Sequence, residues 1–287
     1  MKSPFIFCLC LISIALTAGG CATNPYKFGQ NPDTPLTLKL RVAEPQVERG
    51  RPLPVVDGLG HYLFSLPSKL LLWSWQVDNH NISQETEALI KTYMADNNLD
   101  NVKIRINQYS PGDEWRRLIK NREMPGFFRY TGGVISITLY TILPGRLIGG
   151  DNYNPYTNTI NIYSNSHAVA MHEAAHAKDF GSKQNRNWKG WYTFIRILPL
   201  VPLYQEAKAT EDAIGYASEK QMPNDEKEAY TILYPAYMTY IAAEGTRWTS
   251  PDTLANYAIQ LAAAIPGHII GRIKASSVKE NKSATID

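Results

Sequence analysis

The chain has 287 residues, a formal net charge of +3, and hydrophobic side chains at 44% of its positions. This length and composition suit one large domain or two small ones. Basic residues form no stripe and are not interleaved with aromatic residues, so the sequence gives no sign of a nucleic-acid partner.

The first 20 residues resemble an export signal rather than part of the fold. Lys2 supplies a positive charge, and the apolar run from Phe5 to Thr17 is too short to span a membrane comfortably. The small residues 18 to 20 then precede Cys21. This arrangement resembles the leader of bacterial lipoproteins, in which the cysteine becomes the lipidated first residue. We therefore expect residues 1–20 to be a signal peptide and Cys21 to carry the lipid.

The other cysteines support this prediction. Cys8 and Cys10 lie in the leader, so cleavage would leave Cys21 without a disulfide partner. Ala22 follows Cys21 in place of an aspartate, which resembles sorting to the outer membrane of Gram-negative bacteria. We expect a lipid-anchored protein of the bacterial cell envelope, on the periplasmic side or at the surface. Because leucine is more usual where Ala18 stands, a plainly secreted or leader-anchored protein is the alternative.

Two segments with contrasting composition follow Cys21. Residues 21–58 are rich in proline, asparagine, glycine and charge, which predicts an extended tether with a short strand at 36–42. Residues 61–77 are apolar and aromatic but are broken by Pro67 and Lys69. This second segment favours a core or membrane-surface helix over a membrane span.

Hydrophobic periodicity predicts an α+β fold that is mainly helical. The expected helices cover residues 83–97, 112–121, 166–181, 203–220, 225–244 and 250–274. Alternation predicts a half-buried strand at 101–109 and another at 158–164, and residues 127–148 favour a strand followed by a strand or a helix.

The last long helix contains an uncharged stretch at 254–270, for which we favour a buried helix over a transmembrane helix. Residues 276–287 read as a disordered tail, so the folded domain is expected to cover residues 59–275.

The candidate metal-binding and catalytic motif is the sequence His172-Glu173-Ala174-Ala175-His176. Two histidines four residues apart project from one face of a helix, so both imidazoles can reach one metal ion. Glu173 lies beside this face, where it can accept a proton from a water molecule whose pKa the metal lowers. Ser166 is a suitable N-cap residue for this helix, and Gly181 is a suitable residue at which the helix ends. The alternative to a metal site is an ordinary helix with two surface histidines.

A catalytic zinc ion (Zn²⁺) needs a third protein ligand and an open position. An astacin-like or matrixin-like site would place a histidine six residues beyond His176, but Ser182 stands there. Asp179 shares the histidine face but lies nearly two turns from His172. We therefore expect Asp179 to orient a ligand or to act as a charge at the helix end.

The best third ligand lies on the helix expected at 203–220. Glu206 shares one face of that helix with Thr210, Ala213 and Ala217, whose small side chains permit close packing. Glu211 lies about 140° around the helix from Glu206 and points elsewhere. We therefore choose Glu206.

Residues 158–217 together resemble the gluzincins, zinc metallopeptidases with an HExxH motif on one helix and a glutamate on a following helix. The resemblance implies a zincin-like core and zinc bound by His172, His176 and Glu206, with Glu173 as general base. It also implies that the edge strand of a small sheet precedes the HExxH helix, where an extended peptide could add as a further strand.

One position departs from the family pattern. Many gluzincins have an aspartate four residues after the ligand glutamate, where this chain has Thr210; Asp179 or Asp212 could orient a histidine instead. The runs at 154–160 and 176–179 are also similar to runs in uncharacterised bacterial lipoproteins.

The leading hypothesis is a membrane-tethered zinc metallopeptidase that cleaves a peptide or protein substrate in the envelope. The candidate oxyanion donors are Tyr204, Tyr234, Tyr237, His268 and Arg272. One alternative is a catalytically inactive envelope assembly or binding lipoprotein with a structural or vestigial metal site. Another is a zinc hydrolase that acts on cell-wall or lipid amides.

Overall fold

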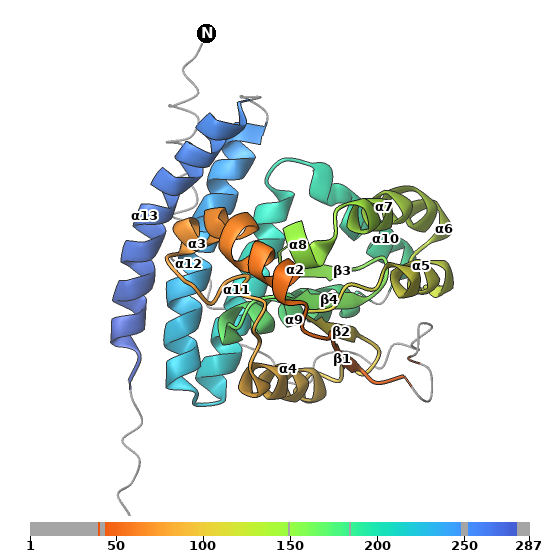
Figure 1. Ribbon diagram of the computed structural model, residues 1–287, viewed down its shortest axis with the longest axis horizontal. Helices are drawn as coiled ribbons and strands as arrows, with labels where there is room; N and C mark the ends of the chain where they lie inside the picture. Colours follow the sequence, from red (N-terminus) through yellow and green to blue (C-terminus); the bar gives the residue numbers. More distant parts are fainter. Residues whose placement is uncertain (1–39, 41–43, 149, 184, 248–251, 280–287) are drawn as a thin grey trace, which may run out of the picture. The chain divides into compact units, whose positions relative to one another are not determined.

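The computed structural model describes residues 40, 44–148, 150–183, 185–247 and 252–279 (Figure 1). The predicted signal peptide, Cys21 and most of the predicted strand at 36–42 lie outside these residues. The described residues divide into two units: one lies within 27–69 and 74–198, and the other lies within 70–73 and 199–279. We call them the sheet unit and the helical unit.

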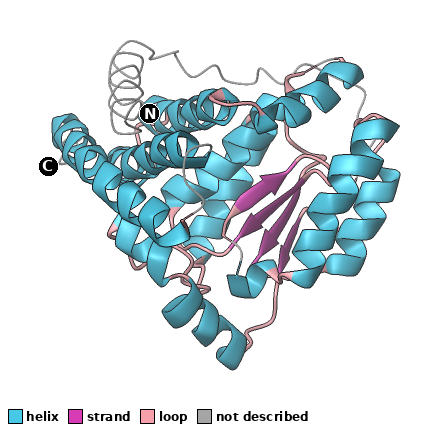
Figure 2. Ribbon diagram, turned by 90° about the horizontal axis from the view of Figure 1, so that it is seen from above, coloured by secondary structure: helices cyan, strands magenta, loops and turns pink. Residues whose placement is uncertain are grey.

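The sheet unit is built on four short strands in the order β1-β2-β4-β3 (Figure 2). They are β1 (Val47–Arg49), β2 (Lys103–Ile106), β3 (Asn152–Asn154) and β4 (Thr159–Ile162). β1, β2 and β4 are parallel, and β3 runs antiparallel to β4 at the edge. With its helices, this small mixed sheet confirms the α+β class and the mainly helical content.

The prediction that an edge strand precedes the HExxH helix is wrong. β4 does precede that helix, but it lies between β2 and β3 and is buried along its whole length. The edge strand β3 was not among the predicted strands, and two of its three residues are asparagines. Asparagine is depleted in strands, so neither propensity nor alternation marked β3.

β2 was expected to be half-buried, yet all four of its residues are buried. The side chains of Lys103 and Arg105 are 0% exposed. Lys103 Nζ lies 2.6 Å from a carboxylate oxygen of Glu48, and Arg105 Nε lies 3.0 Å from one of Glu114. Such pairing offsets part of the cost of burying these charges. Residues 47–49, which supply β1 and Glu48, were predicted to be tether, so the fold begins earlier than residue 59.

Helices make up the rest of the sheet unit. In chain order they are α2 (Pro54–Leu59), η1 (Gly60–Phe64), α3 (Leu66–Leu72, which ends in the helical unit), α4 (Gln84–Asp96), α5 (Pro111–Lys120), α6 (Gly126–Phe128), η2 (Arg129–Gly133), α7 (Val134–Ile142), α8 (Gly145–Ile148), α9 (His167–Gly181), α10 (Arg186–Phe194) and η3 (Ile195–Ile197). The helices predicted at 83–97 and 112–121 are confirmed. A strand at 127–148 was wrong: this segment is helical, and Ile137 packs inward while Ile135 and Leu139 face outward. Its β-branched residues misled the propensity argument.

The helical unit contains α11 (Val201–Glu219), α12 (Pro223–Arg247) and α13 (Thr253–Ser277), which confirms the three long helices predicted there. α13 packs against α12 through its small residues, because a Cβ on Gly267 would lie 2.6 Å from Cα of Pro235. Its large apolar residues, such as Leu254 and Ile273, are exposed, so the predicted buried helix is buried on one face only. Across the described residues, no helix has both the length and the apolar character to cross a membrane.

Candidate metal centre

The helix α9 carries the HExxH sequence directly after β4. Ser166 is its N-cap: the residue has an extended backbone, and its hydroxyl accepts a hydrogen bond from the Val169 N–H at 3.3 Å. Gly181 is the last helical residue. The cap and the stop are both as predicted. Alanines fill much of the buried surface between them, so the two histidine side chains project from a tightly packed helix.

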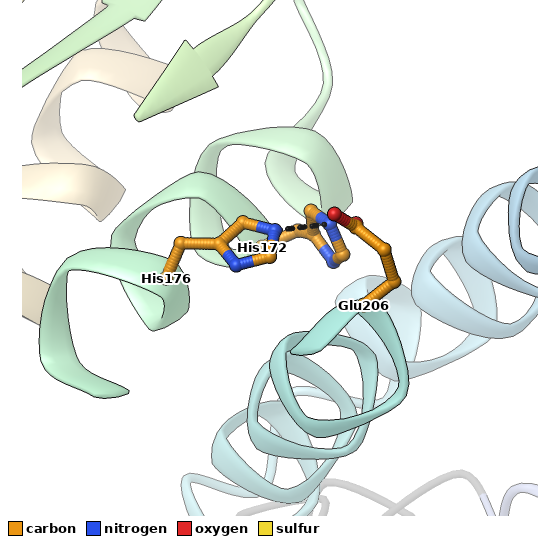
Figure 3. A group of neighbouring side chains, drawn as sticks. All are labelled: His172, His176 and Glu206. Carbon is orange, nitrogen blue, oxygen red and sulfur yellow. Dashed lines mark hydrogen bonds between the residues drawn. The ribbon is translucent and has the colours of Figure 1, made fainter. Parts of the chain in front are cut away.

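The two histidines converge on one point. Nε2 of His172 lies 3.1 Å from Nε2 of His176, and the two rings are nearly perpendicular, with an interplanar angle of 86° (Figure 3). Zinc–imidazole bonds are about 2.0–2.1 Å, so two nitrogens at tetrahedral positions would lie roughly 3.3 Å apart. His172 is buried and His176 is half-buried. This spacing suits a shared metal ion, and it is also the length of a hydrogen bond between the two rings.

Glu206 belongs to the same group of side chains. It lies on α11 and is 3% exposed. One of its carboxylate oxygens and one nitrogen of each histidine all lie within 4.8 Å of one another (Figure 3). The neighbouring carboxylate, Glu211, is half-buried outside this group, and burial raises its pKa. A second group with equally close ligand atoms, His167 with two carboxylates of α12, is only half-buried.

Glu173 follows His172 on α9 and is 8% exposed. Helix geometry puts it beside the histidine face, and that it acts as a general base stays a prediction.

Asp179 and Thr210 are the residues considered as supports for the metal ligands. Asp179 accepts a hydrogen bond from the Tyr192 hydroxyl, and Lys183 Nζ lies 2.9 Å from its other oxygen. These contacts join the end of α9 to α10. Thr210 lies one turn after Glu206 on α11 and is buried. That Asp179 or Thr210 supports a metal ligand stays a prediction.

The candidate oxyanion donors differ in their surroundings. His268 Nε2 lies 2.9 Å from the carbonyl oxygen of Leu71, and its ring stacks on Trp73 with centroids 3.9 Å apart. Arg272 lies over the same tryptophan at 4.8 Å. Burial raises the pKa of both Tyr234 and Tyr237. Residue type and spacing do not rank these donors, and in the structure both His268 and Arg272 contact Trp73.

Sequence reasoning missed a pair of carboxyl groups, the buried Asp78 and the half-buried Asp151, at the junction between β4 and α9. Asp151 accepts hydrogen bonds from the backbone N–H groups of Tyr163 and Ser164, at 2.6 and 3.0 Å. The pair helps to fix the backbone that leads into the histidine helix.

Comparisons with protein-family models, with curated proteins and with solved structures each found no match. The function is therefore inferred from the residues of the site.

Proposed function

We propose that this chain is a zinc-dependent metallopeptidase of the gluzincin type, tethered to a membrane of the bacterial envelope. The observation that carries the proposal is the convergence of two imidazole nitrogens, 3.1 Å apart, on the histidine face of α9. The presence of the Glu206 carboxylate in the same group supports it further.

The donor set fits zinc. Two imidazoles and one carboxylate are the ligands of many catalytic zinc sites, and they leave a coordination position open. When bound, zinc supplies a Lewis acid that lowers the pKa of a water molecule and polarises a carbonyl group. His172, His176 and Glu206 would hold the ion, and the open position distinguishes such a site from a closed structural one.

Glu173 would perform the proton transfers. Its carboxylate accepts a proton as the oxygen of water adds to the peptide carbonyl carbon. It then delivers that proton to the amine nitrogen as the carbon–nitrogen bond breaks. A purely structural metal site has no use for a buried carboxylate beside its ligands, so Glu173 favours the enzyme over the inactive assembly lipoprotein.

The leader supplies the proposed location. Cys21 follows small residues at the end of an apolar run and has no partner cysteine in a cleaved chain. A lipidated Cys21 would keep the domain at the membrane, and the substrate would be a peptide or protein within reach of it.

The test compares metal binding with hydrolysis in the Cys21→Ser chain. We expect about one zinc ion per chain and cleavage of members of an unbiased peptide library. Glu173→Gln should keep the zinc but lower hydrolysis by roughly 10²–10⁴-fold, the usual contribution of a general base. His172→Ala should lose the zinc, and His167→Ala, at the second group, should not. Full zinc binding without any cleavage would instead support the inactive lipoprotein.

A further inference from the structure

The sheet unit has an exposed apolar surface made by two neighbouring helical segments. The first is α2 with η1, where Val55, Tyr62 and Leu63 are 76%, 71% and 58% exposed. The second is α7, where Ile135, Leu139 and Ile142 are 62%, 53% and 68% exposed. We call these six residues the apolar face. Exposed apolar patches of this extent on soluble domains usually mark an interaction site.

Contacts connect the two segments. α8 follows α7 after two residues and packs against both α2 and η1. Arg146 of α8 donates to Asp57 of α2 at 2.8 Å, and Figure 1 shows α2, α8 and α7 in succession. The two segments therefore belong to one packed unit.

The apolar face presents no unpaired charge. The charged residues of 52–68 and 126–148 are Asp57, Arg129 and Arg146. Arg146 pairs with Asp57, and Arg129 is buried and donates to the carbonyl oxygen of Asn121 at 2.8 Å. These internal contacts remove the groups that would resist contact with a lipid surface.

Aromatic and basic side chains continue from this surface. Trp191 of α10 is 50% exposed and packs edge-on against Phe128, just before η2 and α7, with ring centroids 5.3 Å apart. Residues 185–198 hold no aspartate or glutamate but carry the exposed arginines Arg186 and Arg196. Lys189 in this segment pairs with Glu123 at 2.6 Å. Exposed tryptophan and arginine beside an uncharged apolar surface are typical of segments that lie in a membrane interface.

We propose that the apolar face docks on the surface of a phospholipid bilayer that contains anionic lipid. Its aliphatic side chains would enter the boundary between headgroups and acyl chains, and Arg186 would contact anionic headgroups. The setting rests on the proposed membrane location: the predicted anchor, Cys21, precedes Leu53 by only 32 residues. Those residues reach at most about 115 Å when fully extended, so the anchor keeps the face close to the bilayer without imposing the contact.

The experiment measures flotation of the unlipidated Cys21→Ser chain with vesicles of phosphatidylethanolamine and phosphatidylglycerol. We expect binding, and Ile142→Glu should weaken it by about tenfold or more, because it places a charge where an apolar side chain would be buried. Ile273→Glu is the matched control, since Ile273 is 63% exposed on α13, outside the apolar face. This control should bind like the parent chain.

A second variant keeps the test valid if Ile142→Glu fails to fold. Arg186→Gln should lower binding to the anionic vesicles and leave binding to phosphatidylcholine vesicles unchanged. The inference is overturned if the parent chain does not float, or if Ile273→Glu lowers binding as much as Ile142→Glu. It also fails if the chain dimerises in solution through Ile142 instead. The flotation assay is run with a metal chelator. Its outcome therefore does not depend on zinc binding, and it is separate from the outcome of the zinc proposal.

Discussion

The backbone of Asp78 and the carboxyl group of Asp151 both contact one hydroxyl group, that of Ser164. The Ser164 hydroxyl accepts a hydrogen bond from the Asp78 N–H at 2.7 Å and donates one to Asp151. Burial raises the pKa of Asp78 to about 7, and the charge of Asp151 adds to this effect. Burial likewise raises the pKa of Asp151. At least one of the two carboxyl groups therefore favours its protonated form in slightly acidic solution.

This pair predicts a stability that depends on pH. The folded chain holds a proton on Asp78 that the unfolded chain releases above its usual pKa of 3.8. The free energy of unfolding should therefore fall as pH rises from about 4 to about 7. One proton corresponds to about 1.4 kcal/mol per pH unit, so the loss has a ceiling of roughly 4 kcal/mol. Urea unfolding at about pH 5 and pH 8 measures it.

The variant Asp78→Asn separates this effect from the rest of the chain. It removes one titrating group but keeps the shape of the side chain, so stability should vary less with pH and should exceed that of the parent at about pH 8. Asp100→Asn, at an exposed position, serves as the control. Equal pH dependence in both variants would show that the buried pair does not govern stability.

The lipid anchor can be tested separately from the apolar face. The parent chain should need detergent for release from membranes, because an acylated cysteine holds firmly. Cys21→Ser should instead be released by high salt or an alkaline wash, because only surface contacts remain. Membrane fractionation followed by immunoblotting distinguishes the two. If Cys21→Ser still requires detergent, the anchor lies elsewhere in the chain.

The histidine helix could be predicted because its signals are local. Ser166, the alanines and Gly181 each favour a helix boundary or interior through their own backbone and side-chain chemistry. The four-residue spacing of His172 and His176 then follows from helix geometry. Glu206 was chosen by the same periodicity, applied to the small residues of α11.

The parts that could not be predicted depend on distant partners. Lys103 and Arg105 alternate with apolar residues, a pattern that predicts the solvent-exposed face of a strand. They are buried because acidic residues from β1 and α5 reach them. β3 exists because Asn152 and Asn154 pair with β4, which no local pattern indicates. The burial of Asp78 beside Asp151, 73 residues later, is hidden for the same reason.

The contact between α12 and α13 makes a packing prediction. A Cβ on Gly271 would lie 2.3 Å from the carbonyl oxygen of Tyr230, and backbone cannot move aside as a flexible side chain can. Gly271→Ala should therefore destabilise the chain by about 1–3 kcal/mol, the usual cost of overpacking. A Cβ on Gly112 of α5 would meet nothing within 4 Å, so Gly112→Ala should be neutral or slightly stabilising. Thermal unfolding compares the two, and equal losses would contradict the close contact.

The sharpest test of the proposed third ligand compares two carboxylates on α11. Glu206 is in the group with both histidines, whereas Glu211, half-buried five residues later, is outside it. Glu206→Gln should weaken zinc binding by more than about tenfold, because it replaces a charged ligand with a neutral one. Glu211→Gln removes a carboxylate from the same helix and should leave zinc affinity unchanged. Competitive titration against a chromogenic chelator measures both variants in one buffer. If Glu211→Gln loses the metal and Glu206→Gln keeps it, α11 presents a different face to the histidines, and the gluzincin assignment loses its third ligand.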